Sequence, residues 1–71
     1  MTAVPTGRYR HYKGNEYDVI GTARHSESEE EMVVYRQRYG DGSLWVRPSG
    51  MFMEQVAVDG GEAPRFRLIQ P

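Results

Sequence analysis

The sequence contains no cysteine, and this absence removes two common ways of stabilising a small domain. A disulfide framework needs paired cysteines, and structural zinc sites are usually built on cysteine thiolates. A chain of 71 residues buries only about 60% of the surface that its unfolded form exposes, so its core is small. We therefore expect a core of packed aromatic and branched side chains, with no metal and no cofactor.

Long apolar runs are also missing from the chain. No segment approaches the roughly 20 apolar residues that a membrane-crossing helix needs. The first residues, Met1 to Thr6, lack the apolar stretch of a secretory signal, and we expect them to be flexible. The sequence therefore predicts a cytoplasmic protein with a single small β domain over residues 1–71 and no membrane partner.

An excess of charge of one sign is absent, since the formal net charge is −1, but the charges are unevenly distributed. Glu27, Glu29, Glu30 and Glu31 lie close together, and the rest of the chain carries nine basic and six acidic residues. A solvated loop is the commonest explanation of such an acidic run. The mildly basic remainder suits a polar or anionic ligand, but not high-affinity DNA binding, which normally requires a strongly basic domain.

Turn-forming residues are plentiful and divide the chain into short segments. Glycine with asparagine, aspartate or proline recurs at positions 14–15, 40–42, 48–50 and 59–61. Segments of about five to ten residues between such turns favour strands over helices. The last two strands are expected to pair with each other. The predicted strands cover residues 8–13, 16–25, 32–39, 44–47, 54–58 and 65–69.

One helical turn and one bend are expected within this pattern. Pro48 ends the preceding strand, and Met51 and Phe52 follow at a place where a single helical turn would cover the core. Gly21, in the middle of a strand, indicates a bulge or a sharp bend. The predicted fold is all-β: a small SH3-like barrel or a strongly bent antiparallel sheet of about five to six short strands with one helical turn.

The predicted core takes one face of each strand. In the segment 44–47 we expect Leu44 and Val46 to face inward, which sends Trp45 and Arg47 outward together because side chains alternate along a strand. The residues expected to be largely buried are Tyr17, Val19, Val33, Tyr35, Leu44, Val46, Phe52, Val56 and Phe66.

Several short motifs, taken together and in order, resemble one known bacterial family. They are Tyr9-Arg10-His11-Tyr12-Lys13-Gly14-Asn15, Ala23-Arg24-His25-Ser26-Glu27, Tyr39-Gly40-Asp41-Gly42, Leu44-Trp45-Val46-Arg47-Pro48, Met51-Phe52 and Pro64-Arg65-Phe66. They extend from about Gly7 to Ile69 and are similar to the domain of unknown function numbered 1653. The resemblance implies a small cytoplasmic bacterial protein without an assigned activity, and it supplies no catalytic residues.

Tyrosine, tryptophan and arginine are frequent for so short a chain. Small β domains use surfaces of this composition to bind peptides, nucleotides or nucleic-acid strands. The alternative is that many of the rings simply form the core. An exposed tryptophan beside an arginine favours a contact surface. We predict that the ligand-binding residues are Arg10, His11, Tyr12, His25, Trp45 and Arg47, gathered on one patch, with part of the Trp45 ring in solvent.

Two other functions remain open. The two histidines, with Glu54, suggest a small metal-dependent or hydrolytic enzyme. However, consecutive residues such as His25-Ser26-Glu27 point to opposite faces of an extended chain, so they do not assemble into a catalytic triad. The sequence therefore leaves catalysis undecided, favours a protein that is not an enzyme, and predicts no catalytic residue. The other alternative is a structural homo-oligomerisation module, in which the aromatic face meets a copy of itself in a homodimer.

Overall fold

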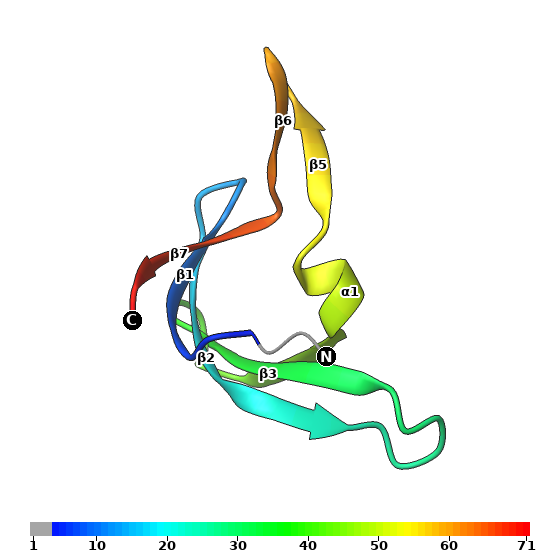
Figure 1. Cartoon of the computed structure of the whole chain (residues 1–71). Coiled ribbons are helices and arrows are strands. Elements are labelled where there is room, and N and C mark those ends of the chain that lie inside the picture. The colour runs from blue at the N-terminus through cyan, green and yellow to red at the C-terminus, as the bar shows by residue number, and fades with distance from the viewer. Residues whose placement is uncertain (1–3) are drawn as a thin grey trace.

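Short alternating segments between glycine turns produce seven strands and one short helix in the computed structural model, which describes residues 4–71 (Figure 1). The expected flexibility of residues 1–6 falls partly on residues 1–3, which lie outside the described residues. In the described part of the chain, no helix has the length and apolar character needed to cross a membrane. The elements are β1 (Gly7–His11), β2 (Glu16–Arg24), β3 (Glu31–Gln37), β4 (Leu44–Pro48), α1 (Ser49–Phe52), β5 (Gln55–Val58), β6 (Gly61–Pro64) and β7 (Phe66–Gln70).

Five strands form one antiparallel sheet in the order β4-β3-β2-β1-β7, and β5 and β6 form a separate hairpin. Figure 1 shows that the sheet is strongly bent and that the hairpin stands away from it, beyond α1. Strands β4 and β7 remain as edges, so the sheet does not close into a barrel. The all-β prediction is thus confirmed in its second form, a strongly bent antiparallel sheet with one helical turn.

The C-terminal part of the chain pairs differently from the sequence prediction. Residues 54–58 were expected to pair with 65–69, but β5 pairs with β6, and β7 pairs with β1. The local reason is the Asp59-Gly60 dipeptide, a strong signal for a two-residue hairpin turn. Gly60 has a φ of 88°, and Gly61 already pairs with Val58, so the partner strand begins immediately after the turn.

Gly21 marks a bulge, as the sequence predicts. The register between β2 and β3 shifts between Val19 and Gly21, so Ile20 is the extra residue on β2. A bulge of this kind reverses the side-chain alternation and bends the strand. It therefore contributes to the curvature of the sheet.

The core lies on the face of the sheet that α1 covers, which we call the inner face. The rings of Phe52 and Phe66 stack with their centroids 4.2 Å apart, and the Tyr9 ring meets Phe52 edge-on at 5.3 Å. The Tyr9 hydroxyl donates a hydrogen bond to the carbonyl oxygen of Pro5 at 2.8 Å, so its burial leaves no unpaired polar group. Tyr17 and Val56 are only partly buried. The buried apolar residues are Val4, Tyr9, Val19, Val33, Tyr35, Phe52 and Phe66.

The side of β4 that faces the core is the opposite of the one that the sequence predicts. Trp45 lies opposite Tyr35 in register, and opposed residues share one face of a sheet. Because Tyr35 is buried in the core, Trp45 belongs to the inner face, and Leu44 and Val46 belong to the outer face. Leu44 and Val46 are 54% and 57% exposed, so the prediction that they are buried is wrong. Strand β4 is an edge, and periodicity alone does not show which of its faces meets the core.

Candidate functional site

Three of the six predicted binding residues line one pocket between β1, β7 and the β5–β6 hairpin. The pocket has a volume of about 250 Å³ and is open to solvent. We call it the β1–β7 pocket. Its lining consists of Arg10, His11 and Tyr12 from β1 and the following turn, Val58, Ala63 and Pro64 from the hairpin, and Arg67 and Ile69 from β7.

Two arginines lie side by side at this pocket. Arg10 on β1 and Arg67 on β7 are register partners, so both side chains leave the outer face of the sheet. Arg10 forms an ion pair with Glu16, with 3.0 Å between Nη2 and Oε2, whereas within residues 4–71 Arg67 forms no ion pair. Like charges that are directly opposed destabilise a strand pair, so an anion held between them would relieve the repulsion.

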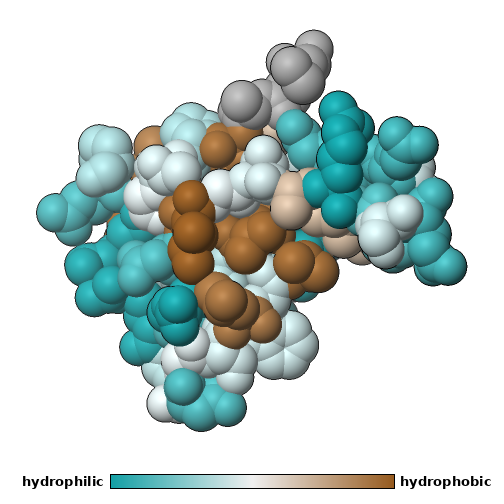
Figure 2. Space-filling model, turned by 90° about the horizontal axis from the view of Figure 1, so that it is seen from below, coloured by the Kyte–Doolittle hydropathy of each residue, from teal (hydrophilic) through white to brown (hydrophobic). Residues whose placement is uncertain are grey.

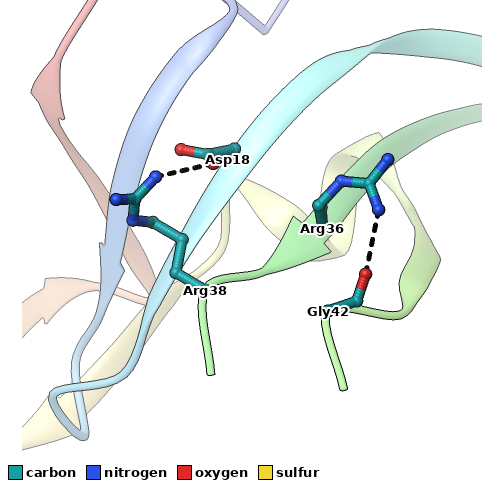
Figure 3. Close-up of polar contacts among 4 residues, drawn as sticks. All are labelled: Asp18, Arg36, Arg38 and Gly42. Carbon is teal, nitrogen blue, oxygen red and sulfur yellow. Dashed lines mark hydrogen bonds and ion pairs between the residues drawn. The ribbon is translucent and has the colours of Figure 1, made fainter. Parts of the chain in front are cut away.

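Two other arginines of the outer face are already engaged. Nη1 of Arg38 donates to Oδ2 of Asp18 at 2.8 Å, which ties the end of β3 to β2 (Figure 3). Nη1 of Arg36 donates to the carbonyl oxygen of Gly42 at 3.0 Å and holds the β3–β4 turn (Figure 3). These two side chains therefore have structural partners, in contrast to Arg67.

His11 and Tyr12 also line the pocket. His11 pairs in register with Phe66, so its ring lies on the inner face, whereas Arg10 and Arg67 leave the outer face. The backbone N–H of Lys13 donates to Nδ1 of His11 at 3.2 Å, so the neutral imidazole carries its proton on Nε2 and is a hydrogen-bond donor there. The His11 ring lies 4.6 Å from the Tyr12 ring and 5.0 Å from the Phe66 ring, measured between centroids. Tyr12 itself is 40% exposed, which leaves aromatic surface for stacking.

The pKa of His11 is lowered, first by burial and then by the positive charges of Arg65, Arg47 and Lys13. The unfolded chain, in which the pKa of histidine is about 6.5, therefore takes up a proton at a higher pH than the folded protein does. The stability that the neutral ring contributes is therefore fully present above the unfolded-state pKa of about 6.5. It is lost as the pH falls from there through the lowered pKa of His11 in the folded protein.

We expect the melting temperature to fall between about pH 7 and pH 5.5, and to fall less in the His11→Gln variant, which has no imidazole to protonate. Thermal melts of the two proteins over this range measure the difference. Titration of the His11 ring protons by NMR checks its cause. A pKa at or above the ordinary value for histidine would contradict this account.

The structure places His25 at the opposite end of β2 from His11. Its Nδ1 accepts hydrogen bonds from the backbone N–H groups of Glu27 at 3.1 Å and Ser28 at 3.3 Å, so the ring holds the turn between β2 and β3. The two histidines are not brought together. In the described residues, there is also no group of three His, Cys, Asp or Glu side chains arranged to hold a metal ion.

Trp45 and Arg47 lie on β4, outside the pocket. The guanidinium carbon of Arg47 is 5.7 Å from the centroid of the Phe66 ring, the same ring that His11 contacts. Trp45 is 51% exposed, as predicted, although it extends from the inner face. The structure thus places Arg10, His11 and Tyr12 in one pocket lining, places Arg47 beside His11 against the Phe66 ring, and separates His25 and Trp45 from them.

Sequence analysis missed Arg67 and the hairpin residues that complete the pocket. The pairing of β1 with β7 brings together segments that are far apart in the sequence, and no local sequence pattern predicts it. One signal was present. Phe66 is an evident core residue, so alternation directs Arg67 to the opposite face.

Comparisons with known proteins agree with the motifs that the sequence contains. The sequence model of a family described as a protein of unknown function, DUF1653, matches residues 7–68. The chain is also similar to the crystal structure of a protein belonging to DUF1653 from Bordetella bronchiseptica, with 35% sequence identity and a TM-score of 0.87. That match covers 94% of this chain and 88% of the other chain. No curated protein matches the chain.

Proposed function

The chain belongs to the DUF1653 family of proteins of unknown function, and we propose that it is a binding module whose β1–β7 pocket takes a nucleotide, free or within a single nucleic-acid strand. The observation that carries the proposal is the opposed pair of Arg10 and Arg67, of which only Arg10 has an acidic partner in the described structure. Guanidinium groups bind phosphate oxygens through paired N–H donors, and two of them side by side form a natural phosphate contact.

The remaining lining suits the planar part of a nucleotide. Bases stack on exposed aromatic rings, and Tyr12 offers such a ring beside the arginines. Val58 and Ile69 provide apolar contacts in the same lining. A volume of about 250 Å³ matches one small ring system with its substituents rather than a large ligand.

Binding explains the pocket better than catalysis does. Among residues 4–71 the lining contains no serine, threonine, cysteine, aspartate or glutamate, so His11 has neither a nucleophile to activate nor a carboxylate to orient it there. A proline-rich peptide is also a poorer match, because recognition of such peptides uses a groove lined by several aromatic rings, whereas Tyr12 is the one exposed ring that the described residues contribute to this lining.

Calorimetric titration tests the proposal with matched probes. We expect adenosine and uridine 5′-monophosphates to bind more tightly than the corresponding nucleosides or inorganic phosphate, because the phosphate and the base use different parts of the pocket. Binding should weaken several-fold when salt is raised from about 0.05 to 0.5 M, since salt screens the arginine charges. Equal affinity for nucleosides and nucleotides, or binding of a proline-rich peptide alone, would contradict the proposal.

A further inference from the structure

Strand β4 is an edge of the five-stranded sheet, and within the described residues it pairs with β3 alone. Leu44, Trp45 and Val46 follow one another on this edge, and each is more than half exposed. Edge strands are normally protected by charges, prolines or bulges, because unprotected ones pair with other strands. On β4 such residues are confined to its C-terminal end, at Arg47 and Pro48, whereas β7 carries Arg67 within the strand and has an irregular register against β1.

The backbone of β4 presents a regular row of unpaired groups at its free edge. The N–H of Gln37 donates to the carbonyl oxygen of Ser43 at 3.1 Å, so Ser43 directs its carbonyl toward β3. The directions of the backbone groups alternate along an antiparallel strand. The N–H and C=O of Trp45 therefore also point toward β3, while those of Leu44 and Val46 point to the free edge. Pro48 is next in this row and has no N–H to offer.

The outer face beside this edge is apolar. Val46 of β4 pairs with Val34 of β3, and Val34 pairs with Gly21 of β2. Gly21 is next to the exposed Ile20, so a row of aliphatic side chains crosses three strands. Figure 2, which views the molecule from below, shows an apolar cluster with hydrophilic residues on both sides. Contiguous apolar patches larger than a few hundred Å² are rare on monomers and often mark interaction sites.

We propose that a second copy of this chain pairs with β4 about a two-fold axis at Trp45, which joins the two sheets into one continuous antiparallel sheet. In this register Leu44 lies opposite the partner's Val46, and every outward N–H and C=O group of Leu44 and Val46 finds a partner. The two Trp45 side chains lie opposite each other on the inner face. A register centred on Val46 would instead place Pro48 opposite Leu44 and leave a carbonyl oxygen unpaired.

The available surface is small, so the dimer is expected to be weak and reversible. A specific interface usually covers about a tenth of a small protein's surface, and this chain exposes 4915 Å² in total. The exposed parts of Leu44, Trp45 and Val46 supply roughly 300 Å² per copy, below that standard, and the flanking β3–β4 turn adds to it. The dimer leaves the β1–β7 pocket free, since β4 and β7 are opposite edges of the sheet, so this inference does not rest on the proposed function.

Sedimentation of the wild-type chain tests association directly. We expect a monomer–dimer equilibrium with a dissociation constant of about 10–100 µM, which is typical of a small interface. The Trp45→Glu variant should stay monomeric, because it places two like charges at the axis. Its circular dichroism should match that of the wild type, since about half of Trp45 is exposed and the residue lies outside the buried core cluster. A wild-type chain that remains monomeric at about 1 mM overturns the proposal.

Cysteine cross-linking tests the register, because the natural chain has no thiol. At a non-hydrogen-bonded antiparallel pair the Cα atoms are about 4.5 Å apart, within the range of a disulfide, so Trp45→Cys should form a linked dimer under mild oxidation. Leu44→Cys and Val46→Cys, which retain Trp45, should link with each other when mixed and little when alone. Ser28→Cys, on the distant β2–β3 turn, is the control for random collision. Linkage of Val46→Cys with itself, or of the control at an equal rate, overturns the proposed axis.

Discussion

Replacing Phe52 with alanine is expected to lower the free energy of unfolding by about 3–5 kcal/mol, a large part of the 5–15 kcal/mol that stabilises an ordinary domain. Phe52 is 1% exposed, and its ring stacks on Phe66 and contacts the rings of Tyr9 and Tyr35. Truncation leaves a cavity where the Phe52 ring packed among the rings of Phe66, Tyr9 and Tyr35. The short α1 has few other contacts that could compensate for this loss. Urea denaturation monitored by circular dichroism measures the change.

Val46→Ala is the matched control for this substitution. The sequence prediction placed Val46 in the core, where truncation would cost several kcal/mol, but the structure places it on an exposed edge. We therefore expect a change below about 1 kcal/mol, measured at a concentration low enough to keep the chain monomeric. Equal losses for Phe52→Ala and Val46→Ala would show that the assigned inner and outer faces are wrong.

Replacing Arg67 with glutamine is expected to weaken binding of a 5′-mononucleotide at least tenfold. A charge-assisted hydrogen bond contributes about 1.5–3 kcal/mol, and 1.4 kcal/mol corresponds to a factor of ten in affinity. The folded state should not suffer, because the substitution removes the repulsion between Arg67 and Arg10 and leaves the core untouched. Calorimetric titration gives the affinity, and a thermal melt of the same protein gives the stability.

Arg36→Gln is the matched control, since it removes the same charge from the same face of the sheet. Arg36 is held by the carbonyl oxygen of Gly42 and lies outside the pocket lining, so we expect its loss to change affinity less than threefold, the level of a long-range charge effect. If the two variants weakened binding equally, net charge rather than the pocket would explain the interaction.

Much of the fold could be predicted from local chemistry. Gly21 signals a bulge because glycine weakens a strand interior, and Pro48 marks the end of β4; both features are where the sequence indicates. Strand pairing between distant segments could not be predicted this way. The β1–β7 pair depends on the whole sheet, and the turn at residues 59–61 was expected, but its second strand was placed at 65–69 instead of at β6.

The residues that line the β1–β7 pocket could be predicted to a similar extent. Arg10, His11 and Tyr12 are consecutive, so one local segment supplies all three to the pocket lining, although the side chain of His11 lies on the opposite face of the sheet from that of Arg10. His11 and His25 were expected to meet because both end strands, but they flank the nine residues of β2 and therefore lie at its two ends. Arg67 comes from the other end of the chain, and only the tertiary pairing reveals it beside Arg10.

The central claim is that the β1–β7 pocket binds a nucleotide, and an amide chemical-shift map of the isotope-labelled chain tests it most directly. Titration with adenosine or uridine 5′-monophosphate should shift the amides of residues 10–12 and 67–69 most, together with Val58 and Ala63 on the hairpin. The shifts should follow a single saturable isotherm and diminish in Arg67→Gln. Shifts centred on β4 or on the turn near His25, or no shifts at millimolar nucleotide, would contradict the account.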